Sequence, residues 1–352
     1  SLYCACIFFG LSVGIACAAG FYLHQANQSE KQERFKVLAR RVAGQVATRL
    51  QTYEYGLRGA RGAVIAGGRE NIRRDQFRQY SLSRDITHEF PGSRGYGFIR
   101  RVAPEQKAAF LQMAQRDQPG FTIKQLRTHD GEIFVIQFIE PESANWQAIG
   151  LDIASEANRR LAALAAVYRD AATLTEPITL VQAADKTVRG FLLLLPVYRG
   201  ETWSALPEER WASVVGWAYT PLVIDEVMAD FDFHGGEFTL SLYDANQIEG
   251  SADPKDPILF YASAGSEAPA TDGLVMKTTL PIYGRNWLAE VKATPRFVAG
   301  LNLLDPRYVT AVMVALGLLA TGLFYAYLLS RRRKRQSILE QARLAAVIES
   351  SN

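Results

Sequence analysis

The chain has 352 residues, of which 48% are hydrophobic and 21% charged. This composition excludes an intrinsically disordered protein, and the length predicts roughly two folded domains at about 100 to 200 residues each. The formal net charge is only +3, and no stripe of basic residues interleaved with aromatics occurs outside residues 331–335, so the sequence predicts no nucleic-acid partner.

Two segments, residues 2–23 and 309–329, contain no charged residue. Each approaches the roughly 20 apolar residues that span the hydrocarbon core of a bilayer. The first is too long for the apolar part of a signal peptide, lacks a convincing small-x-small cleavage site and continues into a polar helix. We therefore expect transmembrane helices at residues 1–24 and 307–330. Because the sequence begins with Ser1 rather than Met, we also expect residues upstream of it.

The basic run RRRKR at residues 331–335 directly follows the second apolar segment. Basic residues beside a transmembrane helix are retained in the cytoplasm. The sequence therefore predicts a multi-pass protein of a bacterial inner membrane, with residues of about 25–307 in the periplasm and the C-terminus in the cytoplasm. Because Cys4, Cys6 and Cys17 all fall in the first apolar segment, the outer domain is expected to depend on its core rather than on disulfides.

A long amphipathic stalk helix is predicted over residues 25–68. Its apolar residues recur at spacings of three and four, the period of one helix face, and Gly67–Gly68 ends the pattern. This face packs on the chain's own domain or, in part, on a second copy of the chain, since the same spacing serves both contacts. The face consists of Phe35, Leu38, Val42, Val46, Leu50, Tyr53, Leu57 and Ala60.

A first α+β unit is predicted at residues 69–200. Mixed helices and antiparallel strands with short hairpins are typical of this class. One hairpin is expected around Asp130–Gly131, and the last helix is expected to be capped by Ser155, with Leu161, Leu164 and Tyr168 on one face. The expected helices are residues 72–90, 105–116 and 155–171, and the expected strands are 95–102, 121–126, 133–141, 172–182 and 190–200.

A second unit is predicted at residues 201–306. Residues 211–222 indicate a strand that runs into a helix at 223–231, and further strands follow. The pattern approximates a small sheet with one helix across it. The later strands are expected at residues 237–245, 258–264, 274–284 and 286–294.

Enzymatic signatures are absent from the sequence. It has no H-E-x-x-H, G-x-S-x-G, C-x-x-C or P-loop motif. The four histidines lie far apart along the chain. We therefore expect no catalytic site, metal or cofactor in these residues.

Three stretches resemble one family: GYGFIRRV from residue 95, then GLDIASE with the arginine-containing helix and TLTEPITL that follow, and PVYRG near residue 200. Together they resemble the CHASE domain, the extracytoplasmic sensor of bacterial receptors and of plant cytokinin-receptor histidine kinases. The resemblance covers roughly residues 75–200. It implies a long stalk helix that carries two stacked PAS-like modules, of which the membrane-distal one, residues 69–200, binds small ligands, and the proximal one spans 201–306.

The resemblance also implies positions for the ligand. The aspartate that holds the adenine-like ring in cytokinin-binding members falls at Ser143, with Glu142 beside it, and the pocket leucine and threonine fall at Leu164 and Thr175. Serine offers no charged acceptor, which argues against cytokinin itself. We expect a small-molecule ligand, either adenine-like or a small organic acid.

A second set of pocket candidates follows from the residues alone. Phe98, Phe138, Phe191 and Leu193 lie in predicted strands whose inner faces form an apolar pocket, or else simply the core.

The function expected from the sequence is that of a dimeric receptor, associated through its stalk and transmembrane helices, that senses a small molecule. A Gly10, Gly14 and Ala18 ridge would let two spans approach closely, although such residues are also common in spans. Residues 331–352 are expected to form a signalling helix that leads into a cytoplasmic PAS domain and an output. That output is a histidine kinase of a two-component system or, alternatively, a diguanylate cyclase with or without a phosphodiesterase. A two-pass scaffolding or adhesion protein is a further alternative.

Overall fold

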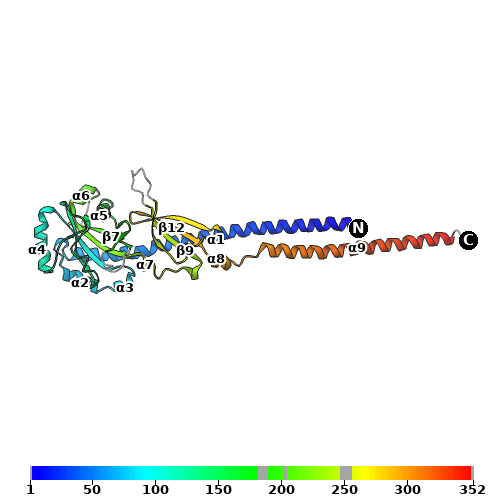
Figure 1. The fold of residues 1–352 in the computed structure, drawn as a ribbon, viewed down its shortest axis with the longest axis horizontal. Coiled ribbons are helices and arrows are strands. Elements are labelled where there is room, and N and C mark those ends of the chain that lie inside the picture. Colours follow the sequence, from blue (N-terminus) through cyan, green and yellow to red (C-terminus); the bar gives the residue numbers. More distant parts are fainter. Residues whose placement is uncertain (1, 181–188, 201–203, 246–255, 350–352) are drawn as a thin grey trace. The chain divides into compact units, whose positions relative to one another are not determined.

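The structure, a computed structural model, describes residues 2–180, 189–200, 204–245 and 256–349 (Figure 1). The chain divides into two compact units. One consists of Ser1–Lys36 with Phe297–Asn352, and the other of Val37–Arg296. Each unit is described by itself.

The first unit consists mainly of two helical segments, the beginning of α1 (Leu2–Ala66) and α9 (Pro306–Glu349). Both helices contain a stretch that is long and apolar enough to cross a membrane, as the sequence predicts. Phe8 and Phe324 stack with ring centroids 5.3 Å apart, and the side-chain amide of Asn27 donates a 2.8 Å hydrogen bond to the carbonyl oxygen of Leu304.

In the second unit, the remainder of α1 packs along the domain. The helix ends at Ala66 and the next glycines turn the chain, with Gly68 at a φ of 87°. Of the two contacts that the sequence leaves open for the apolar face, the structure shows the one with the chain's own domain. The buried residues of this face are Leu38, Val42, Val46, Leu50, Tyr53, Leu57 and Ala60.

The larger sheet has the order β2-β4-β3-β1-β8-β7-β5, and β6 pairs with β7 beside this path. All its ladders are antiparallel except that of β2 with β4. Its strands are β1 (Tyr96–Val102), β2 (Lys124–Gln125), β3 (Ile133–Glu140), β4 (Leu151–Asp152), β5 (Thr173–Leu174), β6 (Ile178–Thr179), β7 (Arg189–Tyr198) and β8 (Val214–Val223).

The hairpin expected around Asp130–Gly131 is wrong, because β2 pairs in parallel with β4 and not with β3. The side chain of Asp152 explains the difference. Its carboxylate accepts hydrogen bonds from the main-chain N–H of Phe134 at 2.8 Å and lies 2.7 Å from Nε2 of His129. These contacts hold residues 126–132 as a loop, and β4 takes the place beside β3.

The strand at residues 214–223 also departs from expectation. It was expected in the second unit of the sequence, yet β8 lies between β1 and β7 in the larger sheet. Its ladder with β7 runs from Gly190↔Val223 to Tyr198↔Val214. The expected strand start at 211 is helical instead, as α6 (Pro207–Ser213), and the following helix α7 is short (Ile224–Val227).

Helix α5 (Ala157–Arg169) covers one face of the larger sheet. Its cap is Glu156, whose carboxylate accepts from the N–H groups of residues 158 and 159, and not Ser155. Of the predicted apolar face, Leu164 packs partly buried against the core, whereas Leu161 and Tyr168 are 62% and 68% exposed, so the prediction is wrong for these two. The alanine-rich face lies on the sheet instead, because small side chains let the helix approach closely, and Trp217 Nε1 donates a 3.0 Å hydrogen bond to the carbonyl oxygen of Ala163.

The remaining helices of this unit are short. The expected helix at residues 72–90 is divided into two, because α2 ends at Leu82 and α3 begins at Ile86. The α-helices are α2 (Arg74–Leu82), α3 (Ile86–Glu89) and α4 (Lys107–Asp117); α8 (Pro295–Gly300) begins at the end of this unit and continues into the first one. The 3-10 turns are η1 (Arg69–Asn71), η2 (Pro104–Gln106), η3 (Glu142–Ala144), η4 (Ile153–Ser155), η5 (His234–Gly236) and η6 (Thr271–Gly273).

The smaller sheet is fully antiparallel, with the order β10-β9-β12-β11. Its strands are β9 (Phe238–Asp244), β10 (Ile258–Ala262), β11 (Val275–Ile282) and β12 (Arg285–Ala293). It shares aromatic contacts with the larger sheet, since the ring of Phe191 lies 5.3 Å from that of Trp287 and 5.1 Å from that of Phe260. The fold is therefore mixed α and β, as predicted, with apolar helices at both ends of the chain.

Candidate functional site

The structure separates the site residues that the sequence singles out. Ser143 is exposed in η3, directly after β3. Glu142 is partly buried, pairs with Arg74 and accepts a 2.9 Å hydrogen bond from the side-chain amide of Gln118. Ser143 and Glu142, the two positions that the family resemblance assigns to the hydrogen-bond acceptor of the ligand, thus lie at the end of the larger sheet where β3 terminates.

Leu164 and Thr175 lie elsewhere. Leu164 packs, partly buried, against the core beneath α5. Thr175 is fully buried, and its hydroxyl oxygen accepts a 3.0 Å hydrogen bond from the main-chain N–H of Leu192, so the side chain completes the ladder beside β5.

The aromatic candidates are core residues. Phe98 and Phe138 are at most 1% exposed, with ring centroids 5.8 Å apart, and Phe77 of α2 packs 4.9 Å from Phe138. Phe191 and Leu193 are equally buried. None of these four belongs to the core beneath α5, where Leu164 lies, so the described structure does not bring the eight residues into one cavity. Their role in ligand binding stays a prediction.

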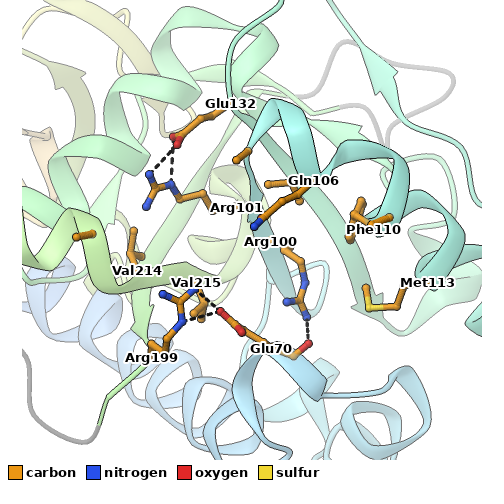
Figure 2. A pocket seen from close by; sticks show the side chains of 14 residues that line it. Glu70, Arg100, Arg101, Gln106, Phe110, Met113, Glu132, Arg199, Val214 and Val215 are labelled. Atoms are coloured by element: carbon orange, nitrogen blue, oxygen red, sulfur yellow. Dashed lines mark hydrogen bonds and ion pairs between the residues drawn. The ribbon is translucent and has the colours of Figure 1, made fainter.

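A cavity of about 510 Å³ opens at the opposite end of the larger sheet. It lies where β1 and β7 end and β8 begins, with α4 as one wall (Figure 2). The volume falls within the range of about 300–1,000 Å³ typical of small-molecule sites. Its lining consists of Glu70, Arg100, Arg101, Val102, Ala103, Gln106, Ala109, Phe110, Met113, Glu132, Arg199, Ala212, Val214 and Val215.

Arg100 is the buried cation of this cavity, with 8% of its surface exposed. Its guanidinium donates hydrogen bonds of 2.7 Å to the side-chain carbonyl of Gln137 and of 2.7 Å to the main-chain carbonyl of Glu70. It also lies 5.4 Å from the ring centroid of Phe98. Burial lowers the pKa of Arg100 to about 10, and the nearby charge of Glu70 opposes that shift. The side chain is therefore still charged at neutral pH.

Arg101 is neutralised differently, although it is the next residue in the strand. Its guanidinium forms a two-point ion pair with Glu132, at 3.1 and 2.7 Å, and lies 4.0 Å from the ring centroid of Trp211. The two arginines of β1 thus point apart (Figure 2). A strand places successive side chains on opposite faces, which explains the separation.

Glu70 connects the cavity to the stalk. It lies in η1, just after the end of α1, and its carboxylate accepts hydrogen bonds from Arg199 at 2.9 and 2.5 Å. Figure 2 shows Glu70 between Arg199 and Arg100. A group that binds in this cavity therefore meets a charged residue next to the end of α1.

Sequence reasoning missed this site. The available signal was the pair of arginines in GYGFIRRV, because a charged residue inside an otherwise apolar strand is costly to bury without a purpose. What the residues do not reveal is that η1 and the end of β7 approach the same strand end.

The structure is thus a mixed α/β domain with a cavity of small-molecule size, in a chain that also contains two helices apolar and long enough to cross a membrane. A comparison with known families matches residues 70–261 to the CHASE domain. This match spans more than half of the chain, and the chain belongs to the CHASE family. It is an extracellular ligand-sensing receptor module, and its two apolar helices fit a membrane protein with a periplasmic domain.

Two solved structures are similar at low identity. One is an extracellular ligand binding receptor from Desulfohalobium retbaense, with 10% identity and a TM-score of 0.47; the match covers 74% of this chain and 40% of that one. The other is the periplasmic sensory domain of the Campylobacter jejuni chemoreceptor Tlp1, with 12% identity and a TM-score of 0.44, covering 78% and 98%. The chain thus spans well under half of the first structure. A search of curated proteins finds no match.

Proposed function

We propose that the chain is the sensor part of a transmembrane receptor and that its ligand binds in the cavity around Arg100. The observation that carries the proposal is the position of Glu70. This residue lines the cavity and follows α1 by four residues, so a ligand that moves it acts on the end of the stalk helix. The fixed charges and the apolar wall of α4 supply the combination that small-molecule sites use for orientation and affinity.

In this proposal the movement is transmitted through the two segments that connect the ligand-binding domain covalently to the apolar helices. Helix α1 is unbroken from Leu2 to Ala66, and toward the C-terminus a single residue, Thr294, separates β12 from α8. Binding would shift α1 relative to the second apolar helix by an ångström or two, and that shift would bias a two-state linker at residues 331–352. The receptor would act as a homodimer through its stalk and spans, in a bacterial inner membrane with its C-terminus in the cytoplasm.

The finer architecture belongs to the same proposal. The larger sheet, including β8, would be the membrane-distal PAS-like module, and β9 to β12 would form the proximal one. A histidine kinase of a two-component system is the proposed output, with a diguanylate cyclase as the alternative. The arrangement is supported by the two sheets, which lie in one compact unit with residues 37–66 of α1.

Thermal-shift screening of the full chain in lipid nanodiscs tests the function. The library contains nucleobase derivatives, organic acids and neutral metabolites. Ala109 lines the cavity and its neighbour Ala108 does not, and both are exposed on α4. Ala109→Trp should therefore abolish the shift of a hit by filling the cavity, whereas Ala108→Trp should preserve it. A hit that both variants bind equally would place the ligand elsewhere, and a library without hits would contradict the sensing function.

A further inference from the structure

We propose that the ligand is a small carboxylate with an apolar body, and that Glu70 occupies the place of its charged group when no ligand is bound. This inference rests on the proposed function and adds the chemical class. It follows from how the charges of the cavity are compensated.

Among the residues that the structure describes, no carboxylate is hydrogen-bonded to Arg100. Its two hydrogen-bond acceptors are neutral carbonyl groups, from Gln137 and the main chain of Glu70. A buried cation is normally paired with an anion, because neutral dipoles replace only part of its lost hydration. An anion in the cavity would therefore gain more from Arg100 than a neutral ligand of the same shape, since charge-assisted hydrogen bonds are the stronger ones.

The ion pair of Glu70 with Arg199 is easy to exchange. The side chains are 45% and 63% exposed. Exposed pairs of this kind contribute little to stability, because water competes with each partner. A ligand carboxylate that bonds Arg199 and Arg100 together would replace one exposed pair by a partly buried one and release Glu70 from its position beside the stalk.

Arg101 is not available to the ligand in the same way, because both oxygens of Glu132 already bind it. This restricts the carboxylate to the side of the cavity that Arg100 and Glu70 share. The remaining wall is apolar and sets the nature of the rest of the ligand. It is formed by Val102, Phe110, Met113, Val214 and Val215.

The test uses the full chain in nanodiscs and matched probes. Butyrate, hexanoate, benzoate and phenylacetate are titrated beside their primary amides. At least one acid should bind at least ten-fold more tightly than its amide. Arg100→Gln should lower the affinity for that acid by roughly ten- to one-hundred-fold, the range for loss of a charged hydrogen-bond partner. Arg94→Gln, which removes an arginine paired with Glu226 away from the cavity, should leave the affinity unchanged.

Glu70→Gln tests the second half of the proposal. Removing the competing carboxylate should raise the affinity of the acid several-fold, and the control Glu226→Gln should not. If Arg100→Gln fails to fold, Arg199→Gln replaces it, because the side chain of Arg199 is largely exposed.

The outcomes separate the two proposals. The proposal that the ligand is a carboxylate would be overturned if the amides bind as tightly as their acids, or if none of the four acids binds. The sensing function itself is decided separately, by the thermal-shift library. If the acid binds more weakly to the Glu70→Gln variant than to the unsubstituted chain, the role of Glu70 as a substitute for the ligand is overturned.

Discussion

The hydroxyl of Tyr283 donates a 3.2 Å hydrogen bond to the main-chain carbonyl of Leu50 in α1. Tyr283 lies in the turn between β11 and β12, and its own carbonyl accepts a 2.9 Å hydrogen bond from the N–H of Leu174 in β5. One turn residue of the smaller sheet thus connects the edge of the larger sheet to the stalk helix.

Replacing Tyr283 by Phe should loosen this connection without changing the packing of the ring. The hydroxyl also has a side-chain hydrogen bond with Glu54, and a net loss of about 0.5–1.5 kcal/mol is expected for each of the two bonds. Thermal unfolding of the full chain in detergent measures it. The control is Tyr168→Phe, because the side chain of Tyr168 is 68% exposed. Equal stability of the two variants would show that the hydroxyl of Tyr283, with its bonds to Leu50 and Glu54, contributes nothing.

Two glycines provide a matched pair for the packing of the fold. A Cβ on Gly97 of β1 would lie 2.5 Å from the carbonyl oxygen of Phe138 and 2.5 Å from the ring of Tyr219, whereas one on Gly62 of α1 would meet nothing within 4 Å. Gly97→Ala should destabilise the domain by about 1–3 kcal/mol through overpacking. Gly62→Ala should stabilise it by about 0.5–1 kcal/mol through helix propensity. Thermal unfolding that shows the same sign for both would contradict the described strand contacts.

The carboxyl group of Glu140 predicts a pH dependence of stability. Burial raises the pKa of Glu140 above its usual 4.5, and Arg74 and Arg78 oppose the shift. The folded state therefore binds a proton more tightly than the unfolded state, and the stability that this proton contributes is present below pH 4.5 and lost as pH rises through the folded pKa. Glu140→Gln removes the ionisation and should raise the melting temperature more at pH 7 than at pH 4.

The check on Glu140 is a pair of melting curves at each pH for the full chain. Glu226→Gln serves as control, because the side chain of Glu226 is 47% exposed and pairs only with an exposed arginine, Arg94, in the described contacts. A Glu140→Gln variant that loses stability at pH 7 would show that its ionised form is favoured by the arginines after all.

Movement of the cytoplasmic linker is a separate prediction. Ile338 and Leu339 of α9 are 63% and 64% exposed, so cysteines at these positions report contacts with a second copy of the chain. Disulfide cross-linking between copies is measured in nanodiscs for the Ile338→Cys variant and for the Leu339→Cys variant. Adding a proven ligand should change the relative cross-linking yields of the two variants. An identical cross-linking pattern with and without that ligand would contradict the proposed transmission to the linker. It would not contradict the proposed binding site.

Local patterns in the sequence were sufficient for the long elements. The periodicity of α1, the apolar runs of β3 and β7 and the glycines after Ala66 each encode their structure within a few residues. Strand partners were not predictable in the same way, because β8 joins the larger sheet through residues far along the chain. The same holds for α5, whose buried face is chosen by close approach of its alanines to Trp217 and not by its largest apolar side chains.

The candidate site could not be predicted from local sequence patterns for a related reason. Arg100 is one residue of a predicted strand, and its burial depends on Gln137 of β3 and on the chain direction after α1. Glu70 and Arg199 are 129 residues apart in the sequence. The family resemblance directed attention to Ser143 and Glu142, which lie at the other end of the same sheet.

Hydrogen–deuterium exchange of the full chain in nanodiscs, with and without a saturating ligand from the screen, tests whether a ligand beside Arg100 acts on the end of α1. Altered exchange is expected in two segments that are distant in sequence, residues 67–71 beside the stalk and residues 100–113 along the cavity. Ala109→Trp should abolish both changes and Ala108→Trp neither. Protection confined to residues 142–175, with 67–71 and 100–113 unchanged, would contradict the claim that the ligand binds beside Arg100 and acts on the end of α1.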